Sequence, residues 1–129
     1  MLAMDDGYGL ALRELLKYPR LKSIKLVSLD AGMTELFKHN GLLLALNKSS
    51  LNNPRVQVIN ADAYQWIRQD TTRYDAIIVD FPDPGNYSIG KLYSAAFYTA
   101  LARRLAPGGR LVVLATHYIL DGFILRPQQ

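Results

Sequence analysis

Short apolar runs alternate with amphipathic segments along this chain of 129 residues, and this alternation limits the possible folds more than any other feature. We expect strands at residues 1–4, 23–30, 55–62, 74–80 and 110–116. Amphipathic helices are expected between them, at residues 10–17, 31–47 (with a break allowed at 40–41), 63–69 and 93–105. The regular order of strand and helix predicts an α/β fold, a parallel sheet with helices on both faces.

Composition excludes several kinds of protein and site. Half of the residues are hydrophobic, and the length suits one domain over residues 1–129. No cysteine is present, which excludes disulfides, thiolate zinc sites and cysteine nucleophiles. The net charge of +4 comes from scattered basic residues, as on a solvated surface rather than a nucleic-acid interface. No apolar run reaches the roughly 18 residues of a membrane span, and no signal peptide is visible, so we expect a cytoplasmic protein.

Carboxylates and one serine lie at the carboxyl ends of four of the expected strands. These residues are Asp5 and Asp6 at the first strand, Ser28 and Asp30 at the second, Asp62 at the third, and Asp80 and Asp83 at the fourth. Ligands of parallel sheets bind beyond the carboxyl ends of the strands. One acid there commonly caps the next helix, which is the simpler interpretation of Asp62 alone. Several acids at one edge repel one another, which favours a cationic ligand or one rich in hydroxyl and amine groups.

A sulfonium nucleoside of the S-adenosylmethionine kind suits this edge better than a metal ion. Its ribose hydroxyls and adenine amino group donate hydrogen bonds to carboxylates. Carboxylates alone can hold Mg²⁺, but no G-x-x-x-x-G-K-[ST] phosphate motif accompanies them, and both histidines lie far from the strand ends in the sequence. We therefore expect no metal. Gly7 and Gly9 allow the backbone to approach a ligand closely, with a plain tight turn as the alternative.

The segment VDFPDP, residues 79–84, is the most specific motif. Asp80 ends the fourth strand, and Asp83 follows between two prolines that stiffen the loop. Such a loop suits the positioning of an amine nucleophile, which arrives protonated because the pKa of an alkylamine is about 10. A carboxylate can orient that amine and accept its proton as the C–N bond forms. A Pro-Asp-Pro turn without a catalytic role is the alternative.

Taken together, these segments resemble the polyamine aminopropyltransferases, the spermidine synthase family. The resemblance covers roughly residues 1–118 and rests on GLALRELLKYP, RVQVINADA, YDAIIVDFPDP, GKLYSAAFY and LARRLAPGG. It implies the Rossmann-like fold of class I S-adenosylmethionine-dependent transferases. It also implies transfer of an aminopropyl group from decarboxylated S-adenosylmethionine, a co-substrate rather than a tightly bound cofactor, to putrescine or a similar amine. The products would be spermidine and 5′-methylthioadenosine.

The resemblance assigns a role to each candidate residue. Asp80 would be the catalytic proton acceptor, Asp83 would bind the substrate amine, and Tyr93 would lie on the putrescine side. The donor nucleoside would be bound by Gly7 and Gly9 in the turn, by Asp30, and by Asp62 with Ala63 at the adenine amino group. The reaction would be a direct displacement without a covalent intermediate, so catalysis would depend on alignment.

The donor site departs from the family pattern at two points. The family turn reads GGGDG, whereas residues 5–9 read DDGYG, so Asp5 and Asp6 replace glycines and Tyr8 replaces the acid. A side chain costs about 1 kcal/mol or more wherever a replaced glycine needs a positive φ. The second strand ends in VSLD instead of VDLD, which places Ser28 where an acid would clamp the ribose. The loss of a charge-assisted hydrogen bond costs about 1.5–3 kcal/mol.

The expected core is truncated at both ends and lacks the family's N-terminal β domain. Exposed sheet edges would favour association, so a homo-oligomer is compatible with the sequence. Three interpretations stay open: an aminopropyltransferase core with an impaired donor site, an inactive member of the family, and a small S-adenosylmethionine-dependent methyltransferase of the same fold. VDFPDP and GKLYS argue against the methyltransferase, whereas the altered turn and Ser28 argue for the inactive member.

Overall fold

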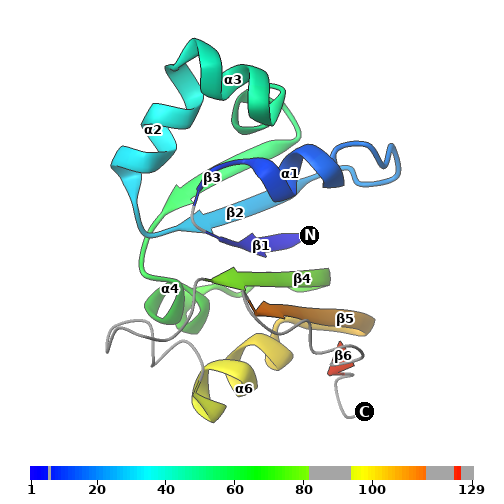
Figure 1. The fold of residues 1–129 in the computed structure, drawn as a ribbon. Coiled ribbons are helices and arrows are strands. Elements are labelled where there is room, and N and C mark those ends of the chain that lie inside the picture. The colour runs from blue at the N-terminus through cyan, green and yellow to red at the C-terminus, as the bar shows by residue number, and fades with distance from the viewer. Residues whose placement is uncertain (6, 82–93, 116–123, 126–129) are drawn as a thin grey trace.

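A sheet with the strand order β3-β2-β1-β4-β5-β6 organises the chain (Figure 1). The computed structural model describes residues 1–5, 7–81, 94–115 and 124–125. The strands are β1 (Leu2–Met4), β2 (Ile24–Ser28), β3 (Val56–Asn60), β4 (Tyr74–Phe81), β5 (Leu105–Ala115) and β6 (Ile124–Leu125). The helices are α1 (Leu10–Leu15), α2 (Ala31–His39), α3 (Gly41–Asn47), the 3₁₀ helix η1 (Ser50–Asn52), α4 (Ala63–Gln69) and α6 (Ala95–Arg103).

The five strands from β1 to β5 run parallel, as the alternating pattern predicts. β2 and β4 pair with opposite edges of β1. The sheet grows from β1 first through β2 and β3 and then, on the other side, through β4 and β5, so the strand order reverses at β1 and creates a switch point there. β6 was not expected: it pairs antiparallel with β5, opposite Leu111 and Val112. A strand of two residues has no measurable periodicity, so only the pairing reveals it.

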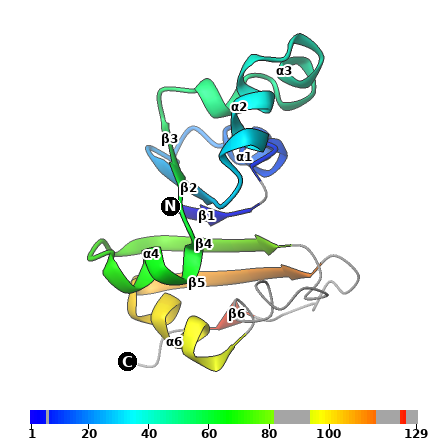
Figure 2. The ribbon, with the colours of Figure 1, turned by 90° about the vertical axis from the view of Figure 1, so that its left-hand side faces the viewer.

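Each face of the sheet has its own core, and β1 contributes to both. Leu2 and Met4 are fully buried in the core that contains Ile67 of α4 and Phe97 of α6. Ala3 enters the core on the opposite face, which contains residues of α1 and η1. Successive side chains of a strand point to opposite faces, and Figure 2 shows the helices on the two sides. The expectation of helices on both faces is therefore confirmed.

The expected helix 31–47 is divided where the sequence allowed a break. Asn40 has extended backbone angles (φ −77°, ψ 125°), ending α2 and preceding α3. Its side-chain oxygen accepts hydrogen bonds from the N–H groups of Leu42 (3.1 Å) and Leu43 (3.3 Å). An asparagine in this position satisfies backbone donors that a new helix leaves without partners. The division turns α3 back over α1, with consequences for the site described below.

The fifth strand begins earlier than its sequence predicts. We expected APGG (residues 106–109) to be a turn that closes a helix, but it lies within β5. The pairing with β4 jumps from Tyr74↔Leu105 to Ala76↔Arg110, so the extra residues form an irregularity in the ladder. A Cβ at Gly109 would lie 2.9 Å from the carbonyl oxygen of Ala106, which explains a glycine there. Glycines in a strand often mark such irregularities.

Arg55 holds the segment that follows α1, and its removal provides a test of the fold. Its guanidinium donates to the carbonyl oxygens of Leu16 (2.6 Å), Leu21 (2.7 Å) and Tyr18 (3.2 Å). We expect Arg55→Ala to lower the free energy of unfolding by about 2–3 kcal/mol, because charged hydrogen bonds are lost at once. Urea denaturation measures this change. Arg103→Ala, at an exposed position in α6, should change stability by less than about 0.5 kcal/mol, and equal effects of the two variants would contradict the assignment.

Candidate functional site

The carboxyl ends of β1 to β4 bring four polar residues into one row. Met4 pairs with Val27 of β2 and with Val79 of β4, so Asp5, one residue beyond, is level with Ser28 and Asp80. Ser28 pairs in turn with Asn60 of β3. Neighbouring strands lie about 4.8 Å apart, so the row crosses the switch point of the sheet. This is the edge at which sheets of this kind bind their ligands.

The turn after β1 depends on its two remaining glycines. Gly7 (φ +85°) and Gly9 (φ +80°) both have left-handed backbone angles. Among the described non-glycine residues only Lys48 and Ser49 have positive φ, so Asp5 escapes the strain expected for a replaced glycine. The Asp5 side chain is buried, and its Oδ1 accepts a hydrogen bond of 2.6 Å from the Gly7 N–H. Asp5 therefore stabilises the turn, whereas Asp6 lies outside the described residues.

Two hydroxyl groups pack closely against this turn. The Ser28 side chain is only 1% exposed, and its Oγ has no hydrogen-bond partner among the described residues. A Cβ at Gly7 would lie 2.8 Å from Ser28 Oγ and 2.8 Å from Thr34 Oγ1. The Asn60 side-chain amide connects these two residues by donating to Thr34 Oγ1 (3.1 Å) and to the Ser28 carbonyl oxygen (3.3 Å). A buried polar atom without a partner is uncommon and often marks a functional position.

Asp30 and Asp62 begin the helices that follow β2 and β3. Asp30 Oδ1 accepts from the Met33 N–H (2.9 Å) at the start of α2. Asp62 Oδ1 accepts from the N–H groups of Tyr64 (3.0 Å) and Gln65 (3.2 Å) at the start of α4. Both carboxylates therefore act as helix caps at the binding edge. Ala63, the first residue of α4, is buried in the core.

Asp80 differs from these capping acids. It lies near the end of β4, half-buried, and desolvation by burial raises the pKa of its carboxyl above the ordinary value of 3.8. A raised pKa makes a carboxylate a stronger base, as proton transfer requires. The other two residues of the expected amine site, Asp83 and Tyr93, lie outside the described residues. The structure thus brings Asp80 together with the donor-side residues and leaves the amine side untested.

Gly9 fits so closely against its neighbours that a methyl group should disturb the turn. A Cβ there would lie 2.6 Å from Ser50 Oγ and 3.0 Å from Asn47 Nδ2. We expect Gly9→Ala to lower the free energy of unfolding by about 2–4 kcal/mol, from the left-handed backbone and the displaced side chains. The matched control is Gly41→Ala, where no heavy atom lies within 4 Å, and thermal denaturation should show it neutral or slightly stabilised. A Gly9 variant as stable as the control would contradict this turn geometry.

The sequence did not identify four polar contributors to this edge, of which Thr34, Asn47 and Ser50 are buried and Asn60 is exposed. Asn60 donates to Thr34 Oγ1, and Asn47 and Ser50 contact the turn from α3 and η1. The three buried residues differ from surface polar residues only in that tertiary packing buries them, and a single sequence does not show packing.

No cluster of three or more histidine and acidic side chains that could hold a metal ion is found in the described part of the chain. The expected absence of a metal stays a prediction. No helix among the same residues is long and apolar enough to cross a membrane. The cytoplasmic location also stays a prediction.

Comparison with known sequences matches this edge and the whole described fold to one family. A model of the spermine/spermidine synthase domain matches residues 1–125. Polyamine aminopropyltransferase 2 of Ralstonia nicotianae is 51% identical over 116 residues, which is 90% of this chain and 23% of that protein. The polyamine aminopropyltransferase of Mycobacterium tuberculosis is 44% identical over 118 residues, 89% of this chain and 22% of that protein. The chain therefore spans less than a quarter of the length of these relatives.

Solved structures give the same result for the fold. A spermidine synthase in complex with the transition-state analogue AdoDATO superposes with a TM-score of 0.78 at 26% identity, covering 87% of this chain and 37% of that one. The spermidine synthase of Thermotoga maritima gives a TM-score of 0.73 at 23% identity, covering 87% and 36%. The second likeness supports the fold alone.

Proposed function

The chain belongs to the spermine/spermidine synthase family, and from this premise we propose that its sheet edge binds decarboxylated S-adenosylmethionine and transfers the aminopropyl group to putrescine or a similar amine. The observation that carries this proposal is the half-buried Asp80, whose pKa burial raises, at the same level of the sheet as the glycine turn. This displacement needs a base close to a turn that can receive the nucleoside. Aminopropyl transfer is the activity in the names of the relatives, which are much longer proteins.

The donor nucleoside would lie along the turn, beside the end of β2. The backbone at Gly7 and Gly9 would meet its atoms, and the unpartnered Ser28 hydroxyl would donate to or accept from the ribose. Asp62 and Ala63 would meet the adenine amino group, with Asp30 at the outer side of the ribose. Asp30 and Asp62 cap helices through Oδ1, and a carboxylate accepts several hydrogen bonds, so capping is compatible with a ligand contact.

Asp80 would remove the proton that the attacking amine releases. The amine nitrogen attacks the carbon next to the sulfonium, the C–N bond forms and the C–S bond breaks, and the electron pair of the broken bond neutralises the sulfur. The proton lost by nitrogen passes to the Asp80 carboxylate. Asp83 and Tyr93, for which the structure gives no geometry, would hold the other end of the amine.

Because of Ser28, we expect this chain to be less active than a family member that has an acid at the same position. A neutral hydroxyl makes a weaker contact with a ribose diol than a carboxylate, which accepts both hydroxyls through charge-assisted bonds. We therefore expect the donor to bind weakly rather than not at all. The second candidate function is a family member without activity, and the observation that favours it is also Ser28.

Product analysis tests the proposed activity. Purified chain is incubated with decarboxylated S-adenosylmethionine and putrescine, and spermidine and 5′-methylthioadenosine are measured by chromatography and mass spectrometry. Equal amounts of both products, in excess of a reaction without protein, would support the proposal. A folded chain that binds 5′-methylthioadenosine and forms neither product would favour the inactive candidate.

A further inference from the structure

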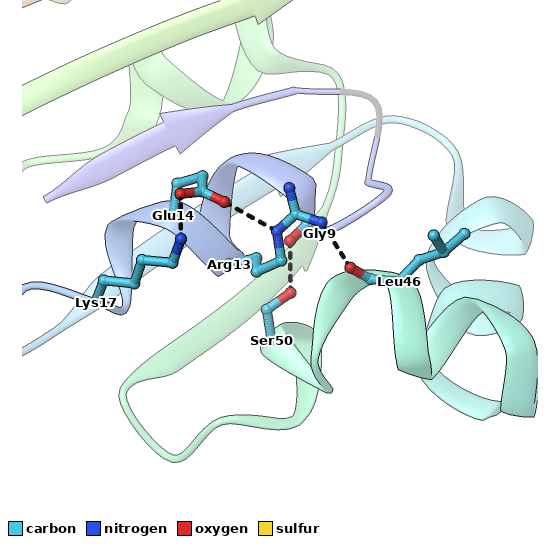
Figure 3. A network of polar contacts seen from close by, with 6 residues as sticks. All are labelled: Gly9, Arg13, Glu14, Lys17, Leu46 and Ser50. Atoms are coloured by element: carbon cyan, nitrogen blue, oxygen red, sulfur yellow. Dashed lines mark hydrogen bonds and ion pairs between the residues drawn. The ribbon is translucent and has the colours of Figure 1, made fainter.

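Two buried side chains hold the glycine turn from behind. Ser50 Oγ donates a hydrogen bond of 2.6 Å to the carbonyl oxygen of Gly9, as Figure 3 shows. Asn47 Nδ2 donates to the carbonyl oxygens of Tyr8 (3.0 Å) and Phe37 (3.1 Å). We call this pair, Asn47 and Ser50, the brace. It connects the turn after β1 to α3 and η1, which are separated from it by about 40 residues of sequence.

The brace fixes the orientation of two successive peptide planes. Each peptide unit is planar and trans, so a carbonyl that points to the brace directs the N–H of the same unit to the opposite side. Binding the Tyr8 carbonyl therefore orients the Gly9 N–H, and binding the Gly9 carbonyl orients the Leu10 N–H. The Gly9 carbonyl also accepts the first helical bond of α1, from the Arg13 N–H at 3.0 Å. The brace thus sets both the turn and the start of α1.

The contacts of the brace distinguish it from Ser28, which is equally buried but has no hydrogen-bond partner among the described residues. Ser50 Oγ and Asn47 Nδ2 already donate to backbone carbonyl oxygens, so we assign them to holding the turn rather than to contacting a ligand. The turn fits the brace closely, because a Cβ at Gly9 would lie 2.6 Å from Ser50 Oγ. A second tie holds α1 to α3 at the surface, where Arg13 Nη1 donates to the Leu46 carbonyl oxygen at 2.8 Å (Figure 3). That tie joins the two helices, whereas the brace contacts carbonyl groups of the turn itself.

We propose that Asn47 and Ser50 are positioning residues, which hold the Tyr8–Gly9 turn in the shape that receives the donor nucleoside. The ligand part of this inference rests on the proposed function, whereas the brace itself does not. The Ser50 hydroxyl is buried and makes its hydrogen bond to the Gly9 carbonyl oxygen, and an alanine would fill nearly the same volume without that bond. Loosening the brace should therefore disturb the turn and the affinity for the nucleoside, and leave the sheet intact.

Ser50→Ala tests the brace, with Asn52→Ala as the matched control. Asn52 also lies in η1, but its side-chain amide donates to the Lys38 carbonyl oxygen (3.0 Å) in α2. We expect Ser50→Ala to speed amide hydrogen exchange at Gly9 and Leu10, followed by NMR, and to weaken 5′-methylthioadenosine binding, each about tenfold. Ser50→Thr, which restores the hydroxyl, should recover both. Asn52→Ala should alter neither, although its melting temperature falls.

The possible results distinguish failure of the brace hypothesis from failure of the proposed function. Unchanged exchange in Ser50→Ala, or the same change in Asn52→Ala, would overturn the brace. Faster exchange with unchanged nucleoside affinity would overturn its role in binding. If the unaltered chain binds no 5′-methylthioadenosine, the proposed function fails by itself, and the exchange measurement still decides whether Ser50 and Asn47 position the turn.

Discussion

Asp80→Asn should reduce aminopropyl transfer by a factor of about 100 to 10,000, the usual contribution of a general base, and leave 5′-methylthioadenosine affinity within about twofold. The amide keeps the shape of the carboxylate but cannot accept the proton of the attacking amine. Steady-state rates measure the first effect and calorimetry the second. The loss should therefore appear in kcat, because the donor site itself is unchanged.

The same variant should stabilise the fold at neutral pH. Burial raises the pKa of Asp80 above its ordinary value of 3.8, so the folded state disfavours the charged form. Below pH 3.8 the carboxyl is neutral in both states and has no effect. As the pH rises from 3.8 to the raised pKa, ionisation costs the fold stability, and above that pKa the full cost remains. The melting temperature of Asp80→Asn should thus exceed that of the unaltered chain at pH 7, and the difference should shrink as the pH falls toward 3.8.

Asp75→Asn is the matched control, since Asp75 lies near the start of the same strand, exposed and away from the binding edge. It should keep normal turnover. In the unaltered chain the rate should fall as the pH drops through the raised pKa of Asp80, because the base becomes protonated. Turnover of Asp80→Asn close to that of the unaltered chain would remove Asp80 from the mechanism.

Ser28→Asp should tighten 5′-methylthioadenosine binding about tenfold to a hundredfold, the value of a charge-assisted hydrogen bond. Ser28 ends β2 in the row with Asp5 and Asp80, and a carboxylate there can accept both hydroxyls of a ribose. The free variant should be less stable, because the position is only 1% exposed and the new charge is buried. Calorimetric titration and thermal denaturation show the two opposite changes.

Ser28→Asn separates the charge from the size of the new side chain. It has nearly the same volume as the aspartate variant, and we expect its affinity to stay within about threefold of the unaltered chain. Equal gains in both variants would mean that the larger side chain, rather than its charge, improves binding. No gain in Ser28→Asp, in a chain that remains folded, would place the ribose elsewhere along the edge.

The sheet could be predicted from the sequence because its strands are periodic and its helices separate them. The apolar runs of β1 and β4 and the alternation of β3 are local signals, and the break at Asn40 follows from local capping chemistry. β6 and the early start of β5 could not be predicted, because both depend on pairing with a neighbour. In APGG the glycines suggested a turn, whereas in the structure Gly109 allows a close backbone approach and Gly108 adopts a positive φ within the strand.

The candidate site divides in the same way. Asp80 and the two glycines were identified by motif, and the structure places them at one edge. The unpartnered hydroxyl of Ser28 and the buried brace were not visible, because burial and missing partners are properties of packing. At Asp5 the sequence left open whether a positive φ would strain the replaced glycine position; its backbone avoids positive φ, and its carboxylate stabilises the turn.

Calorimetric titration of the chain with 5′-methylthioadenosine and, separately, with S-adenosylhomocysteine tests the central claim most directly. We expect 5′-methylthioadenosine to bind at least about tenfold more tightly, because the carboxylate of S-adenosylhomocysteine would meet the acids of the edge. The opposite preference would indicate a methyltransferase site. Binding of neither ligand, by a chain shown to be folded, would contradict a working donor site and leave the fold of the family without its chemistry.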